Sequence, residues 1–441
     1  MRDMQNSSQV FQFCHSGKAS SLVSTSSLHS TPLSVQLNST QPPLASKEPS
    51  IFSHRVWSAA FTHCSFNIGE CVALHATSND VTSLAQGAFF DDSCVMSNHH
   101  SPFTDQSTAV IMSATAVLGR TMRAAVVRQF GAAENILIES AFEQPKPTGA
   151  QVLVRVHSCG VNPVDTYIRS GQYANLPKLP YIPGREGAGI VAEVGEEVSS
   201  VKPGDRVWFT YPLTGSAAEY TITEHAYMLP DELTFSQGAS LGIAYMTAFR
   251  ALFLKAQAKP GQSVFVHGAS GGVGLAACQL AASAGLKVVG SAGTEAGITI
   301  AKANGAEFVA NHREPDYVKV LTEQYPDGFD IVLEMLANVN LAHDAQLVAK
   351  YGKICVIGSR GEIQINPRTL MQKESSIIGV MLWHCTREDY DYMGNEISRL
   401  ISEGHIRPVV GKEYPLEELA AAHHEVINQT GSLGKIIVNI R

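Results

Sequence analysis

The chain has 441 residues, of which 44% are hydrophobic and 16% charged, and its formal net charge is −8. At roughly 100–200 residues per domain, this length predicts two or three domains. The negative charge gives no bulk attraction to nucleic acid or to an anionic membrane. No window approaches the roughly 18–20 consecutive apolar residues of a transmembrane helix. The eight cysteines form no C-x-x-C pair and no disulfide framework, which indicates reduced thiols in the cytoplasm.

Residues 1–111 are rich in Ser, Thr, Asn, Gln and His and keep neither a helical nor a strand period. Such a segment buries too little apolar surface to offset its ordering entropy, so we expect disorder. It lacks the apolar run of a secretory signal, and it has too few arginines to favour mitochondrial import. We expect an extraneous extension from an upstream reading frame, with the protein starting at Met112. Mass spectrometry of the native N-terminus tests this.

Residues 112–239 predict a first folded domain made of short strands. The strand-like runs are residues 123–128, 151–156, 187–195 and 205–209, with proline and glycine between them. Several short strands without intervening helices are typical of a small β-barrel-like domain. We find no catalytic triad signature in this segment.

Residues 240–383 change to a strand–helix–strand pattern. We expect a buried strand at residues 262–267, a helix at 275–284 that Gly285 ends, and strands at 287–292, 329–334 and 353–357. This alternation predicts an α/β domain with a doubly wound parallel sheet. Ligands bind beyond the carboxyl ends of such strands, so Asn340 and residues 358–360 are candidate cofactor loops. A loop-capping role is the alternative for Asn340.

The turn HGASGGVG, residues 267–274, joins the first of these strands to the helix. It matches G-x-G-x-x-G with Ala269 in place of the first glycine. The second glycine, Gly271, lets the backbone approach a pyrophosphate, and the third, Gly274, lets helix and strand pack closely. The helix N-terminus then offers free N–H groups to the phosphates. The flanking elements favour a dinucleotide site over a glycine-rich turn without a ligand.

The identity of the dinucleotide depends on the end of the second strand. An NAD site usually carries an acid there, but this chain has Ala292 and Gly293. Without that carboxylate a 2′-phosphate is not repelled, so we expect NADPH. His312, Arg313 and Lys302 are the candidate basic groups, and no clear cluster can be derived from the sequence.

Four stretches carry a family resemblance: residues 159–171, 267–279, 334–341 and 373–380. The chain resembles the medium-chain dehydrogenase/reductase superfamily and, within it, quinone oxidoreductases of the zeta-crystallin type, over about residues 115–441. The resemblance implies a GroES-like β-barrel catalytic domain at 112–239, a Rossmann-type domain at 240–383 and a return to the catalytic domain at 384–441.

The resemblance also bears on zinc. Zinc-dependent relatives have a Cys ligand where this chain has Asn162 and a His ligand where it has Arg185, and the four-cysteine zinc lobe is missing. A catalytic zinc needs three protein ligands, so we expect no metal. Without a Lewis acid, the acceptor must already be electrophilic, as a quinone is.

By resemblance, Tyr167, Asn162 and Asp165 form the catalytic set. Tyr167 lies beside nicotinamide and acceptor and has a positioning role, because a phenol of pKa about 10 is a poor acid at neutral pH. The resemblance places the pyrophosphate, the adenosine end and the nicotinamide side along the second domain. The expected cofactor-binding residues are Tyr167, Ser270, Gly271, Gly272, Val273, Gly293, His312, Asn340, Ile357, Gly358, Ser359, Arg360, Val380, Met381 and Leu382. A plain surface histidine is the alternative for His312.

We therefore expect an NADPH-dependent quinone reductase that gives semiquinones from ortho-quinones by one-electron transfer. The resemblance adds a homotetramer and binding of AU-rich RNA. An NADPH-dependent enoyl or alkenal reductase is the second enzyme hypothesis, because the same scaffold serves those substrates. A binding or lens-structural role is the non-enzyme alternative. The chain has no RNA-recognition motif, and its acidic charge argues weakly against that role.

Overall fold

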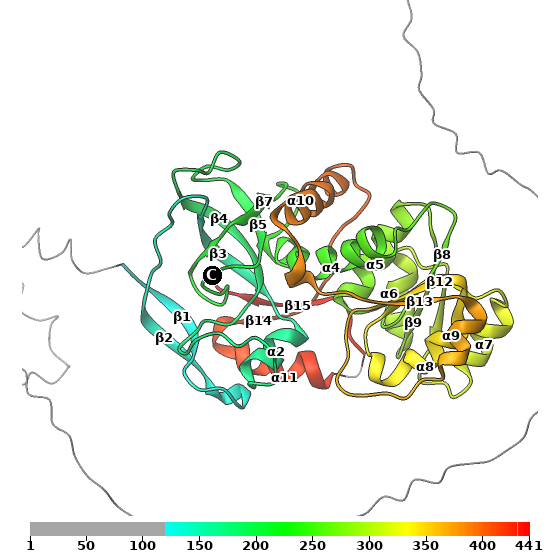
Figure 1. Cartoon of the computed structure of the whole chain (residues 1–441). Helices are drawn as coiled ribbons and strands as arrows, with labels where there is room; N and C mark the ends of the chain where they lie inside the picture. The colour runs from blue at the N-terminus through cyan, green and yellow to red at the C-terminus, as the bar shows by residue number, and fades with distance from the viewer. Residues whose placement is uncertain (1–119, 430) are drawn as a thin grey trace, which may run out of the picture. The chain divides into compact units, whose positions relative to one another are not determined.

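The computed structural model describes residues 120–429 and 431–441. The predictions for residues 1–111 and for Met112 lie outside the described residues. No helix in the described ranges is long and apolar enough to cross a membrane. Two sheets organise this part of the chain, one of seven strands and one of six, and a separate β-hairpin joins β1 (Thr121–Val127) to β2 (Ile136–Glu143) (Figure 1).

The seven-stranded sheet has the order β14-β15-β3-β4-β5-β7, with β6 paired to β3. Its strands are β3 (Val152–Gly160), β4 (Glu186–Val194), β5 (Arg206–Thr210), β6 (Tyr220–Thr223), β7 (His225–Met228), β14 (Val410–Pro415) and β15 (Lys435–Asn439). The first strands of this sheet lie where we expected strands. β14 and β15 come from the end of the chain, drawn red in Figure 1, and β15 pairs antiparallel with β3.

Helices surround this sheet and connect it to the second one. They are α2 (Pro163–Arg169), α3 (Phe235–Gly238), α4 (Met246–Phe249), α10 (Arg387–Ser402) and α11 (Leu419–Asn428), and π-helical turns at Leu241–Tyr245 and Arg250–Lys255 flank α4. The start of α2 is fixed by its own sequence: Asp165 Oδ2 accepts a hydrogen bond from the Asn162 N–H at 2.8 Å, and Pro163 follows at the first helical position.

The six-stranded sheet is parallel, with the order β10-β9-β8-β11-β12-β13. Its strands are β8 (Ser263–Val266), β9 (Lys287–Ala292), β10 (Phe308–Asn311), β11 (Phe329–Glu334), β12 (Val348–Val356) and β13 (Ser376–Gly379), and its helices are α5 (Gly272–Ser283), α6 (Glu295–Ala303), α7 (Tyr317–Gln324), α8 (Ala337–Leu347) and α9 (Pro367–Lys373). The order reverses between β8 and β11, which is where doubly wound sheets bind ligands. The predicted Rossmann-type sheet is confirmed.

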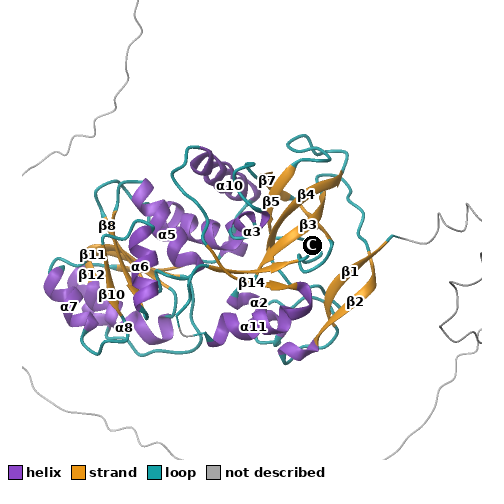
Figure 2. Cartoon of the chain, turned by 180° about the vertical axis from the view of Figure 1, so that it is seen from behind, coloured by secondary structure: helices purple, strands orange, loops and turns teal. Residues whose placement is uncertain are grey.

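Alternating burial explains the apolar run of β8. Val264 and Val266 belong to the core beneath α5 and α6, whereas Phe265 belongs to the core on the opposite face beneath α7 and α8. Side chains of a strand alternate between faces, so a strand covered on both sides must be apolar throughout. Figure 2 shows the helices on both sides of this sheet. The carboxyl end of β8, where the glycine-rich turn begins, is thus held from both faces.

Candidate active site

The glycine-rich turn has the geometry that close helix–strand packing requires. Gly268 has φ +57°, a left-handed conformation that favours glycine, and Gly271 N–H bonds to Gly268 O at 3.0 Å. A Cβ on Gly274 would overlap the Gly268 carbonyl oxygen and come within 2.7 Å of Ala269 Cα. The helix begins at Gly272, three residues before the predicted start, because the last glycines of the motif are themselves helical.

Gly271 differs because a Cβ there would make only ordinary van der Waals contacts with the protein. Its φ of −83° suits any residue, and a Cβ there would meet no protein atom nearer than 3.5 Å. The first N–H groups of α5 have no partners within the helix and carry its positive dipole end. The predicted Ser270–Val273 segment therefore offers backbone N–H groups that can bind an anion. These residues fit a pyrophosphate.

The adenosine end lies beyond β9, at Gly293. A Cβ on Gly293 would lie 2.7 Å from His312 Nε2 and 3.0 Å from Arg313 Nε, so both side chains converge on this glycine. His312 Nδ1 also contacts Ser291 Oγ at 3.4 Å. Lys302 lies in the last turn of α6 and is exposed, at the opposite end of that helix from Gly293. Of the three candidate basic residues, the structure brings two to the end of β9.

The C-terminal strand touches the same turn, a contact that sequence reasoning missed. Gly434 N–H bonds to Ser270 O at 2.9 Å, and the stem of Lys435 packs beside Gly272. Lys435 Nζ forms an ion pair with Glu186 Oε1 at 2.6 Å and donates to Asn162 Oδ1. Lys435 is 5% exposed and Glu186 is 0% exposed. A charged residue at the start of the apolar run of β15 was the available signal.

Asn162 and Asp165, two of the predicted catalytic residues, are held inside this network. Asn162 Nδ2 donates to Glu186 Oε1 at 2.7 Å, and Glu186 Oε2 accepts from Ile243 N–H at 2.7 Å. Asp165 is buried against the start of α2, and that burial raises its pKa to about 6. Asp165 holds the backbone at the start of α2, and Asn162 contacts the buried charges of Glu186 and Lys435 beneath the site.

Tyr167, the third predicted catalytic residue, meets a predicted cofactor residue. Arg360 Nε donates to Tyr167 Oη at 3.1 Å, and Arg360 N–H donates to Asn338 Oδ1 at 2.8 Å. The strand-end loop carrying Arg360 is held by Glu334 O, which accepts from Ile357 N–H at 2.8 Å and Gly358 N–H at 3.3 Å. Tyr167 is therefore oriented by the loop after β12.

The other residues predicted on the nicotinamide side differ in their position and in their exposure. Asn340 was expected in a loop, and that is wrong: it lies in the first turns of α8, and its Nδ2 donates to Glu334 Oε1 at 3.2 Å. The carboxylate of Glu334 also accepts the Leu336 N–H, so it caps the helix from the preceding strand. Val380 and Leu382 are buried, whereas Met381 is exposed and its sulfur accepts from the Tyr173 hydroxyl at 3.7 Å.

Comparisons with known proteins identify the family. The family described as zinc-binding dehydrogenase matches residues 272–399, and the alcohol dehydrogenase GroES-like domain matches residues 148–249. The quinone oxidoreductases of Rattus norvegicus and Homo sapiens are each 48% identical over 322 residues, 72% of this chain and 98% of the relative. The chain belongs to the zeta-crystallin-type quinone oxidoreductases of the medium-chain dehydrogenase/reductase superfamily.

A solved structure gives the same fold. A mycobacterial protein in complex with NADPH is similar with a TM-score of 0.67 and 26% identity, over 73% of this chain and all of that one. The GroES-like and Rossmann-type fold class expected for this family member is therefore confirmed.

This family member also buries three ionisable side chains beneath the turn, which sequence reasoning missed. His267 Nε2 lies 2.6 Å from Asp344 Oδ1 and 3.2 Å from Glu334 Oε2. Both carboxyls are 0% exposed. Burial raises the pKa of each carboxyl to about 7 and lowers the pKa of His267. The cluster anchors Glu334, which in turn caps α8 and holds the loop after β12.

Asp344→Asn should make stability less sensitive to pH. The folded chain binds the Asp344 proton more tightly than the unfolded chain, so the contribution of Asp344 to stability falls as the pH rises from about 4 to about 7. The asparagine is neutral at every pH and avoids that loss. We expect Tm of the variant minus Tm of the wild type to be more positive at pH 8 than at pH 5, measured by calorimetry. Asp316→Asn, at an exposed position, is the control; a pH-independent difference for Asp344→Asn contradicts the prediction.

Proposed function

We propose that the chain is an NADPH-dependent, zinc-independent quinone reductase that reduces ortho-quinones to semiquinones. The observation that carries this is the glycine-rich start of α5 at Gly271 and Gly272, followed by a guanidinium, Arg313, beside Gly293. The printed names of the relatives, quinone oxidoreductases, supply the acceptor class, and the NADPH complex of a structural neighbour supports the cofactor. Asn162 and Arg185 at the places of zinc ligands support the zinc-independent mechanism.

The chain's own residues bind and orient the reactants in this proposal. NADPH supplies two electrons and one proton when bound. Ser270–Val273 hold the pyrophosphate, Gly293 with His312 and Arg313 meets the adenosine end, and Arg360 fixes the hydroxyl of Tyr167. Two quinone molecules each accept one electron, so two semiquinone anions, one NADP⁺ and one proton result. Tyr167 then acts by position, since no proton has to reach the acceptor.

A substrate panel separates this function from its alternative, an enoyl or alkenal reductase. Steady-state turnover is measured with ortho-quinones and with 2-alkenals, with and without a chelator. We expect faster turnover on ortho-quinones and no effect of the chelator. Faster turnover on alkenals would demote the quinone proposal in favour of the alternative. Loss of activity with the chelator would overturn the zinc-independent mechanism.

Arg313→Ser should weaken the binding of NADPH more than the binding of NADH. A charge-assisted hydrogen bond to a 2′-phosphate is worth roughly 1.5–3 kcal/mol, so we expect KM for NADPH to rise by about 10–100-fold. KM for NADH should change little, because NADH lacks that phosphate. Lys302→Ala, at the far end of α6, is the matched control and should leave both constants unchanged. Equal effects of Arg313→Ser on both cofactors would contradict the assignment.

Further properties of the family are proposed on resemblance: a homotetramer, a cytoplasmic location and binding of AU-rich RNA. Sedimentation of the purified chain measures the assembly. A gel shift of AU-rich RNA with and without NADPH tests RNA binding, and competition by NADPH is the outcome expected if RNA shares the Rossmann site.

A further inference from the structure

Arg185 lies in an aromatic slot beside the predicted catalytic residues. Its guanidinium carbon is 5.8 Å from the centre of the Tyr211 ring and 5.5 Å from the centre of the Trp383 ring. The two rings are 5.4 Å apart and tilted by 42°. Tyr211 has φ +49°, a strained conformation for a non-glycine residue, and its N–H donates to Arg185 O at 2.9 Å. The backbone thus fixes the ring against the cation.

The N–H groups of the Arg185 guanidinium are the second feature of this site. In residues 120–429 and 431–441 it forms neither a hydrogen bond nor an ion pair with a protein acceptor. The nearby carboxyl of Asp165 accepts from the Asn162 N–H. A half-buried guanidinium with five N–H donors and no protein acceptor is suited to a ligand that brings oxygen atoms.

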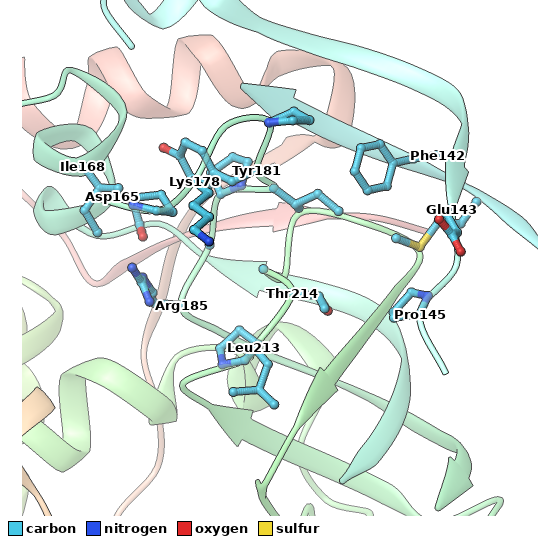
Figure 3. A pocket seen from close by; sticks show the side chains of 18 residues that line it. Phe142, Glu143, Pro145, Asp165, Ile168, Lys178, Tyr181, Arg185, Leu213 and Thr214 are labelled. Atoms are coloured by element: carbon cyan, nitrogen blue, oxygen red, sulfur yellow. The ribbon is translucent and has the colours of Figure 1, made fainter. Parts of the chain in front are cut away.

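The slot opens on a pocket and adjoins the predicted nicotinamide side. Arg185 lines a pocket of about 340 Å³ together with Asp165, Lys178, Tyr181 and Leu213. Figure 3 shows Arg185 and Lys178 at the same end of this pocket, near Asp165. On the other side, Trp383 Nε1 donates to Tyr173 Oη at 2.6 Å, and the Tyr173 hydroxyl contacts Met381. An acceptor bound to the Arg185 guanidinium would therefore lie between the pocket and Met381.

We propose, resting on the proposed quinone reductase function, that Arg185 binds both adjacent oxygens of an ortho-quinone acceptor and stabilises the negative charge that forms on them. A guanidinium presents two parallel N–H groups, which match two oxygens on one edge of a ring. A para-quinone carries its oxygens on opposite edges of the ring, so only one oxygen can bind to the two N–H groups of the guanidinium. The electron that reaches the acceptor places its charge on the oxygens beside a permanent cation. Tyr211 and Trp383 contact the guanidinium itself and so hold it in place for the ligand.

The test compares two isomers that do not alkylate thiols: 9,10-phenanthrenequinone, an ortho-quinone, and 9,10-anthraquinone, a para-quinone. Dissociation constants are measured on the full chain with NADP⁺ by quenching of tryptophan fluorescence. We expect Arg185→Met to raise the dissociation constant of the ortho isomer by about 10–100-fold, because charge-assisted hydrogen bonds are lost. The para isomer should change by less than about 3-fold, since at most one weak contact is lost. Arg185→Lys keeps the positive charge but lacks the two parallel N–H groups. Its dissociation constant for the ortho isomer should lie between those of wild type and Arg185→Met.

Arg368→Met, at an exposed position, is the matched control, and calorimetry checks that each variant is folded. Equal losses for both isomers, no loss for either, or no binding of the ortho isomer by wild type would overturn the proposal. NADPH oxidation is measured separately. Arg185-dependent ortho binding without NADPH oxidation would contradict the proposed function and leave the assignment of Arg185 standing.

Discussion

Lys435→Met should lower the free energy of unfolding by about 3–5 kcal/mol, the usual cost of removing one partner from a buried ion pair. Lys435 and Glu186 are almost fully buried and their charged atoms lie 2.6 Å apart. Without the ammonium group, the carboxylate of Glu186 stays in a dry site, where it is strongly disfavoured. The same change removes the donor to Asn162 Oδ1 and the packing of the Lys435 stem beside Gly272. We therefore expect weaker NADPH binding as well.

Denaturant unfolding and cofactor fluorescence measure the two effects. The double variant Lys435→Met with Glu186→Gln removes both charges, so it should recover much of the stability that Lys435→Met loses. NADPH affinity should stay reduced in the double variant, because the stem beside the glycine turn is still altered. A double variant as unstable as the single one would show that charge compensation is not what Lys435 provides.

Gly271→Ala and Gly274→Ala should fail in different ways. On Gly274 the added methyl meets the backbone of Gly268 and Ala269, so the helix must move and we expect a loss of about 1–3 kcal/mol or more in unfolding free energy. On Gly271 it meets only ordinary protein contacts at 3.5 Å or more. That variant should keep the wild-type Tm but bind NADPH about 10–100-fold more weakly, because the methyl occupies the space of the pyrophosphate.

Calorimetry and NADPH fluorescence on both variants separate folding from binding. Gly268→Ala is a useful control, since its Cβ would meet nothing within 4 Å and it should cost only the strain of its positive φ, about 1 kcal/mol. Wild-type NADPH affinity in Gly271→Ala would show that the start of α5 does not hold the phosphates.

Local patterns were enough for four strands of the second sheet, β8, β9, β11 and β12, but the edge strands β10 and β13 were not predicted. The strand before the turn, the glycine motif and the helix after it are encoded within about thirty residues of one βαβ unit, and the structure has all three. The error at Asn340 arose because the residue that caps α8 is Glu334, on the preceding strand, and not a residue of Ser, Thr or Asp type at the helix start.

Contacts between residues far apart in the sequence could not be predicted from local patterns. Lys435 and Asn162 are 273 positions apart, and their contact depends on β15 pairing with β3, which no local pattern shows. Likewise, the sequence identifies Arg185 only as the replacement of a zinc ligand. Its aromatic neighbours Tyr211 and Trp383 come from separate loops that meet only in the folded chain.

Oxidation of NADPH by the full chain with 9,10-phenanthrenequinone, followed by the absorbance of NADPH, should be compared between wild type and Gly271→Ala. We expect rapid oxidation by wild type that depends on the quinone. For a Gly271→Ala variant of unchanged Tm, we expect a rate lower by about 10-fold or more at subsaturating NADPH. No quinone-dependent oxidation by wild type, or equal rates for the two proteins, would contradict this expectation.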